Sequence, residues 1–107
     1  MVTYQGDDEW GVLGDGTRRA IVLTLSRGPR AVGELAASLP VSRPAVSQHL
    51  KVLKAAGLVA ERPDGTRRIY ELNEAGLRAL RDQLDTFWKR AMVGYQQVVE
   101  QSNEETP

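Results

Sequence analysis

The segment from Ser42 to Ala56 constrains the fold more than any other part of this 107-residue chain. A proline precedes it and a glycine follows it, and neither residue continues a helix well. Ser42 suits the N-cap of a helix, and Pro44 falls in the first turn, where its missing N–H does no harm. Three apolar residues then recur within about 60° of one another, and these are Val46, Leu50 and Leu53. The segment therefore predicts an amphipathic helix with one buried side.

The opposite side of this helix is polar and cationic. It carries Pro44, Gln48, Lys51 and Ala55, with Ser47 and Arg43 at its edge. No acidic residue occurs between Arg43 and Ala60, although a helix meant only for solvent normally mixes Glu with Lys. A groove lined by phosphates accounts for the missing acids, and Gln, Arg and Ser can hydrogen-bond to base edges. The helix is therefore predicted to enter the major groove of DNA.

The flanking segments predict a winged helix-turn-helix. Residues 32–39 have helical apolar spacing and end before a proline, which leaves a turn of helix-turn-helix length. Two strand-like runs, 58–62 and 67–72, surround Pro63-Asp64-Gly65-Thr66 and predict a bulged hairpin, or wing. Its cationic tip is expected to contact phosphates or the minor groove. Thr66 and Arg67 are the expected contacts, and Arg68 is the arginine expected to pack against Tyr70 or an acid.

Helices are also predicted on both sides of residues 31–72. Trp10 to Leu25 indicates two helices broken at Gly14-Asp15-Gly16, with Asp15 as the N-cap of the second. Asn73 is expected to cap a last helix from about Glu74 to about Glu100. A helix this long outreaches a small core, so its apolar side is predicted to pair with a second copy of the chain. The expected interface comprises Trp10, Leu13, Leu77, Leu80, Leu84, Phe87, Trp88, Ala91, Met92 and Tyr95.

The net charge of zero hides an uneven distribution. Residues 27–72 carry eight basic and four acidic side chains, whereas residues 1–26 carry two basic and four acidic ones. Residues 73–107 carry four basic and six acidic side chains. The basic middle is thus flanked by acidic ends, a pattern that favours a polyanionic partner for the middle of the chain.

Composition excludes several other classes of protein. The chain has no cysteine and one histidine, His49, so neither a thiolate metal site nor a histidine cluster can be assembled. His49 is expected to be packed or to bond a phosphate. No Ser-His-acid set and no Gly-rich phosphate loop is present, so an enzyme is not expected. The longest apolar runs are too short to span a membrane and the acidic start is unlike a signal peptide, which favours a cytoplasmic protein. No cofactor is expected, because neither a metal-ligand set nor a phosphate-binding loop is present.

The stretch GPRAVGELAASLPVSRPAVSQHLKVLKAAGLVAERPDGTRRIYEL resembles the DNA-binding core of the ArsR-type winged helix-turn-helix repressors. LGDGTRRAIVLTL and LRDQLDTFW resemble the helices before and after that core, except that Gly16 stands where the family commonly has proline. The resemblance implies a homodimeric repressor, often acting on its own promoter. Many such proteins sense metals through Cys, His or acidic ligands, so this chain is similar to a metal-independent branch. The expected DNA contacts are Ser42, Arg43, Pro44, Ser47, Gln48, Lys51, Thr66, Arg67 and Arg68.

The sequence thus predicts a mainly α single domain over residues 1–107. It would comprise a helix-turn-helix at 31–56, a wing at 58–72 and a dimerisation helix at 74–100, with flexible segments at 1–8 and 101–107. Duplex DNA, as an inverted-repeat operator, and a second copy of the chain are the expected partners; no small-molecule effector is identified. Two alternatives stay open: a winged-helix module that binds another protein, and a regulator with a small ligand in the dimer seam around Trp10, Phe87 and Trp88.

Overall fold

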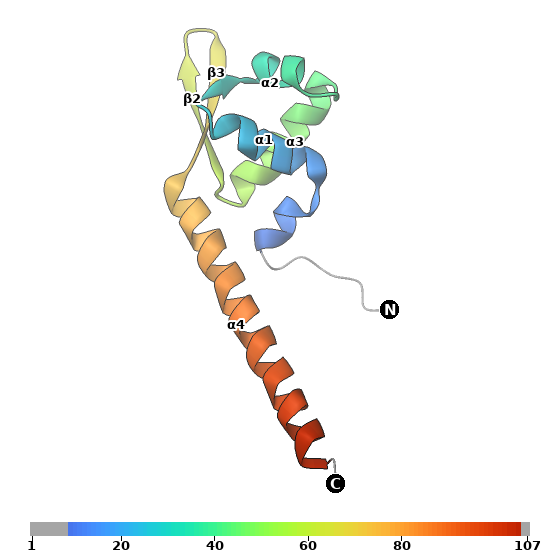
Figure 1. Ribbon diagram of the computed structural model, residues 1–107. Helices are drawn as coiled ribbons and strands as arrows, with labels where there is room; N and C mark the ends of the chain where they lie inside the picture. Colours follow the sequence, from blue (N-terminus) through green and yellow to red (C-terminus); the bar gives the residue numbers. More distant parts are fainter. Residues whose placement is uncertain (1–8, 106–107) are drawn as a thin grey trace.

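The computed structural model describes residues 9–105, and it is mainly helical with one small antiparallel sheet (Figure 1). The fold is the predicted winged helix-turn-helix. Its elements in chain order are the 3-10 helix η1 (Glu9–Gly14), α1 (Gly16–Leu25), β1 (Arg30–Ala31), α2 (Val32–Ser38), α3 (Arg43–Ala55), β2 (Val59–Asp64), β3 (Arg67–Leu72) and α4 (Glu74–Glu105).

Asp15 separates η1 from α1, as predicted. Its Oδ1 accepts hydrogen bonds from the backbone N–H groups of Thr17 at 2.8 Å and Arg18 at 3.1 Å, which caps the helix. The bond from Arg18 is the largest cause that lowers the pKa of the Asp15 carboxyl below its ordinary value. The cap starts α1 at Gly16, without a proline at that position. The segment before it differs from the prediction, because it forms a 3-10 helix.

Replacing Asp15 by Asn should make the stability of the protein less sensitive to acid. Asn also caps helices well but carries no titratable charge. Because the folded-state pKa of Asp15 is lowered, its charge stabilises the fold above the unfolded-state pKa of about 3.9, and this contribution is lost as pH falls through the folded value. Thermal unfolding followed by circular dichroism should show wild type above D15N at pH 7, with the gap closing below about pH 4. A gap that does not change with pH would contradict this expectation.

The sheet has the order β1-β3-β2, so that β3 is central. β2 and β3 pair without interruption from Val59 opposite Leu72 to Asp64 opposite Arg67. The predicted four-residue bulged turn is therefore wrong, because Pro63 and Asp64 extend β2 and leave a two-residue turn. Gly65 supplies its positive φ of 63°, as the first position of a type II′ turn requires. Pro63 is tolerated because β2 is an edge strand.

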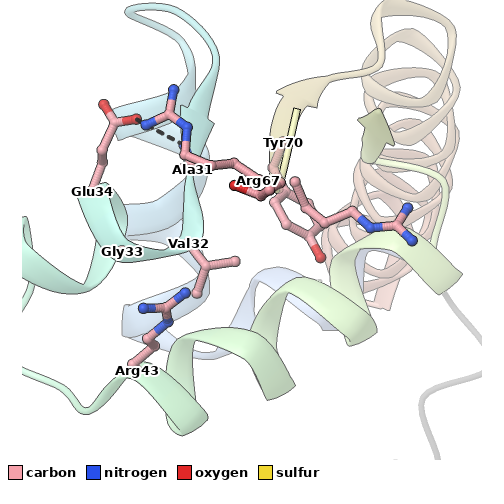
Figure 2. Close-up of a pocket in the computed structure, with 9 residues that line it drawn as sticks. Ala31, Val32, Gly33, Glu34, Arg43, Arg67 and Tyr70 are labelled. Atoms are coloured by element: carbon pink, nitrogen blue, oxygen red, sulfur yellow. Dashed lines mark hydrogen bonds and ion pairs between the residues drawn. The ribbon is translucent and has the colours of Figure 1, made fainter. Parts of the chain in front are cut away.

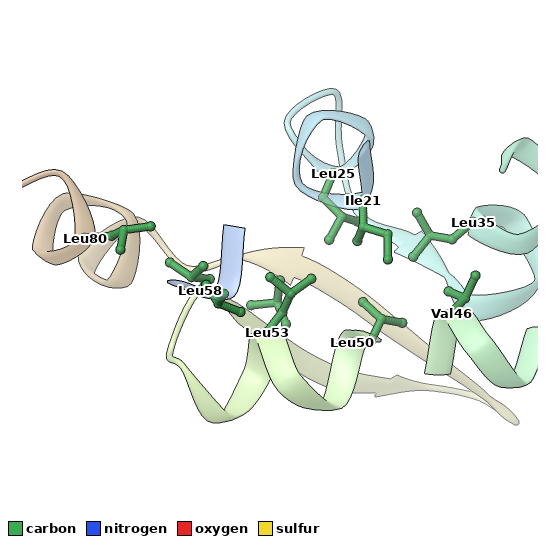
Figure 3. Close-up of a cluster of buried hydrophobic side chains, with 10 residues drawn as sticks. Ile21, Leu25, Leu35, Val46, Leu50, Leu53, Leu58 and Leu80 are labelled. Atoms are coloured by element: carbon green, nitrogen blue, oxygen red, sulfur yellow. The ribbon is translucent and has the colours of Figure 1, made fainter. Parts of the chain in front are cut away.

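The hydrophobic core lies where α1, α2, α3 and the start of the wing meet (Figure 3). The predicted buried side of α3 is confirmed, since Val46, Leu50 and Leu53 are all fully buried. Ile21 of α1, Leu35 of α2 and Leu58 complete the fully buried set. Because the core holds one side of α3, the opposite side of that helix must face outward.

Helix α4 extends far beyond this core. Its 32 residues correspond to about 48 Å at 1.5 Å per residue. The helix therefore accounts for most of the long dimension of the molecule, which measures 72 × 28 × 22 Å. It reaches Glu105, so residues 101–105, expected to be flexible, are helical; the other segments expected to be flexible, 1–8 and 106–107, lie outside the described residues. No helix within residues 9–105 has the length and hydropathy needed to cross a membrane.

Candidate nucleic-acid interface

The outward side of α3 presents every residue that the sequence assigned to it. These side chains are all exposed, and they are Ser42, Arg43, Pro44, Ser47, Gln48, Lys51 and Ala55. The helix begins as predicted, because the Ser42 hydroxyl accepts a hydrogen bond from the N–H of Ala45 at 3.3 Å. His49 is half-buried beside this surface. Sequence reasoning missed Val52, which is also exposed; its spacing of four from Gln48 would have placed it there.

The wing tip is exposed, and one of its arginines, Arg67, is already paired with acids. Thr66, Arg67 and Arg68 are all exposed. Arg67 forms the ion pairs of the tip, with Glu34 at 3.4 Å and Asp64 at 3.8 Å. Arg68 extends into solvent, where its charge still acts on Glu61 and Tyr70. The sequence predicts that Arg67 is the free contact and Arg68 the packed one, whereas in the structure it is Arg67 that forms ion pairs with acids.

A polar network attaches the wing to the end of α3. Lys54 Nζ lies 2.6 Å from Glu61 Oε1, and the Tyr70 hydroxyl also hydrogen-bonds to Glu61. The hydrogen bond from Lys54 lowers the pKa of Glu61, and burial, with a smaller contribution from Glu61, raises the pKa of Tyr70. The three residues come from α3, β2 and β3. The network therefore links the end of the exposed helix to both strands of the hairpin.

A cleft of about 490 Å³ separates the starts of α2 and α3 from the wing (Figure 2). Arg43 lies at the α3 side of this cleft and Arg67 at the wing side, with Glu34 on α2 paired to Arg67. Arg68, Thr66 and Tyr70 also line it. With three arginines against one glutamate, the cleft is cationic and open to an anionic strand that passes between helix and wing.

The residues predicted to form a dimer interface divide into two groups. Leu84, Phe87, Trp88, Ala91, Met92 and Tyr95 are exposed along α4. Leu80, in contrast, is only 7% exposed and belongs to the core of its own chain, with the half-buried Leu77 packed beside it. The assignment of Leu80 to an interface is therefore wrong: the apolar spacing continues unchanged where α4 leaves the core.

The N-terminal part of the predicted interface also packs within the chain. Trp10 contacts Phe87 edge-on, with ring centroids 4.8 Å apart. Leu13, half-buried, packs against the core. These contacts attach η1 to α4 and leave the far half of α4 uncovered. Val98 and Val99 extend the exposed apolar stripe beyond the predicted residues.

Metal-ligating side chains do not gather in the described part of the chain. Within residues 9–105 no three His, Cys, Asp or Glu side chains lie close enough together to hold a metal ion.

A helix-turn-helix whose second helix exposes a polar, acid-free side next to a cationic hairpin defines a winged helix-turn-helix DNA-binding protein. The model of the arsR family of bacterial regulatory proteins matches residues 15–61. A relative from Mycobacterium tuberculosis, the HTH-type transcriptional regulator Rv2034, is 61% identical over 107 residues, which cover 99% of this chain and 100% of the relative. The chain belongs to the ArsR family.

Solved structures agree with this assignment. A possible transcriptional regulator for arsenical resistance is 44% identical and superposes with a TM-score of 0.72, over 81% of this chain and 95% of the other. The transcriptional repressor BigR from Xylella fastidiosa is 29% identical, with a TM-score of 0.61 over 77% and 82% of the two chains. These relatives carry the names of transcriptional regulators, which fits a protein that is not an enzyme. The prediction of an ArsR-type, DNA-binding transcriptional regulator is confirmed.

Proposed function

We propose that this protein is a repressor that binds an inverted-repeat operator as a homodimer and does not respond to metal. The observation that carries the proposal is the exposed side of α3, which is polar, acid-free and adjacent to the cationic cleft. Residues 31–56 act as the helix-turn-helix, 58–72 as the wing and 74–105 as the dimerisation segment. The lack of cysteine and the single histidine support the absence of metal sensing.

In this proposal α3 reads bases and the wing holds the backbone. Gln48 is suited to a bidentate contact with adenine and Arg43 to one with guanine, while Ser47 can bond to either. Lys51 and the wing residues Thr66, Arg67 and Arg68 contact phosphates, which orients the protein without reading sequence. The network through Lys54, Glu61 and Tyr70 links the two parts.

The exposed stripe on α4 supports the dimer. Two copies related by a twofold axis would cover the stripe on both and place their α3 helices about 34 Å apart, which is one turn of DNA. An operator read in this way is an inverted repeat. Binding there represses transcription by excluding polymerase from the promoter.

Replacing Gln48 by Ala should weaken binding to the operator by ~1–3 kcal/mol, or about 5- to 150-fold, and relax base preference. Fluorescence anisotropy would compare a duplex from upstream of the protein's own gene with a shuffled duplex of the same composition, at about 0.15 M salt. Gln97→Ala on α4 is the matched control, since it removes the same type of side chain at a position away from the proposed DNA interface. Equal losses on both duplexes would refute base reading by Gln48, and equal wild-type affinity for both would refute the proposed operator binding.

A further inference from the structure

One carboxylate oxygen of Glu34 makes two contacts. Its Oε1 accepts a hydrogen bond from the backbone N–H of Ala31 at 3.2 Å, which caps the start of α2. The same oxygen lies 3.4 Å from a guanidinium nitrogen of Arg67, 33 positions along the chain. Capping requires only an acceptor, which Gln supplies equally well. The negative charge at position 34 therefore needs a separate explanation.

The location of this charge is unusual for a surface that binds DNA. Glu34 is the one acidic residue among the described residues that line the cleft, and it is paired there with Arg67 (Figure 2). Arg43 and Arg68 are the other charged residues of the lining. Helix α3 has no acid at all. The Glu34 and Arg67 side chains remain about half exposed, at 49% and 56%. A phosphodiester group entering the cleft can therefore reach the guanidinium that Glu34 now neutralises.

We propose that Glu34 competes with the DNA backbone for Arg67 and thereby limits the affinity of the protein for DNA. A carboxylate and a phosphodiester each bear one negative charge and accept the same hydrogen bonds from a guanidinium. When DNA binds, Arg67 must leave Glu34, or Glu34 must stay beside a phosphate and repel it. In either case, part of the binding free energy gained from the contact between Arg67 and the phosphate is lost. Glu34 is thus a positioning residue that acts through Arg67, and this inference rests on the proposed DNA-binding function.

Glu34→Gln should tighten DNA binding by about two- to fivefold, the range expected for loss of an exposed ion pair. Because a phosphate carries no sequence information, the gain should be the same on the own-gene duplex and on the shuffled duplex. The plot of log K against log salt should also become steeper by up to about 0.9, one additional phosphate contact. A purely structural role in capping would not change this slope. An unchanged melting temperature would show that Gln preserves the cap.

Two further variants make the test specific. Glu74→Gln makes the same change in net charge on α4, where Glu74 pairs with Arg78 at 2.6 Å outside the cleft, and it should leave affinity and slope unchanged. In the Arg67→Ala background, Glu34→Gln should have little effect, because the competing guanidinium is gone.

An equal gain from Glu74→Gln, or an equal gain without Arg67, would overturn the inference in favour of a general charge effect. Normal wild-type binding with no change in E34Q would overturn this inference alone. Failure of the wild-type protein to bind either duplex would overturn the proposed function, and the inference with it.

Discussion

Leu84→Glu is expected to convert the proposed dimer into a monomer and to weaken binding to the proposed operator by about 10²- to 10⁴-fold, the gain that a second linked binding site commonly provides. Leu84 is 50% exposed, and farther along the same side of α4 Trp88 is 63% and Tyr95 66% exposed. Large apolar side chains in a continuous exposed stripe mark an interaction surface. A carboxylate in this stripe would be buried without a partner on both chains, which strongly opposes association.

Val93→Glu is the matched control for this prediction. Val93 is 53% exposed on the same helix, but nine positions from Leu84 are two and a half turns, so it lies on the opposite side. It should remain dimeric and bind the operator normally. Light scattering with size-exclusion chromatography measures the mass, and anisotropy measures the affinity. A dimer that persists in L84E would show that α4 associates through another surface, and dissociation by both variants would show that any added charge disturbs the helix.

The prediction of α3 succeeded because all of its signals are local. Ser42 supplies the cap, Pro44 the rigid first turn, and Val46, Leu50 and Leu53 the buried side, all within one segment. Such signals do not depend on what lies elsewhere in the fold. The same reason explains why the exposed candidates on α3 were correctly placed.

The errors involve residues whose partners are distant in sequence. Strand β1 has two residues, and it exists only because Arg30 and Ala31 pair with Tyr70 and Ile69 of β3. Two residues carry no readable alternation of their own. The contact between Glu34 and Arg67 is non-local in the same way, since the two residues meet only because the wing lies beside α2 in the fold. Charge counting along the chain registers both residues but not their pairing.

The misplaced interface residue has a related cause. Leu80 and Leu84 have the same residue type and lie one helical turn apart, yet the first is buried in the core and the second is exposed. Their difference depends on where η1 and the hydrophobic core stop covering α4. Periodicity shows which side of a helix is apolar, but tertiary packing decides which partner covers each turn.

Gly76→Ala should be among the most destabilising changes in the chain, because α4 closely approaches the turn that follows α3. A Cβ on Gly76 would lie 1.8 Å from the carbonyl oxygen of Gly57 and 2.7 Å from its carbon. That backbone cannot yield easily: Gly57 has a positive φ of 80°, and its carbonyl accepts a hydrogen bond from Asn73 Nδ2 at 3.1 Å. Asn73, predicted as the cap of α4, thus joins the start of α4 to the turn after α3.

We expect G76A to lower the free energy of unfolding by about 3 kcal/mol, at the upper end of overpacking effects, which corresponds to a fall in Tm of roughly 12–24 °C. Gly94→Ala is the control, because nothing lies within 4 Å of a Cβ at that position of the same helix, and alanine there should stabilise the helix by up to about 1 kcal/mol. Thermal unfolding at one protein concentration would measure both. The contact between Gly76 and Gly57 sets the direction of α4 relative to α3, and hence the spacing of the two recognition helices in the proposed dimer. G76A should therefore also bind the proposed operator more weakly at temperatures where it remains folded. Equal Tm values for G76A and G94A would show that the close approach of α4 to Gly57 does not exist in solution.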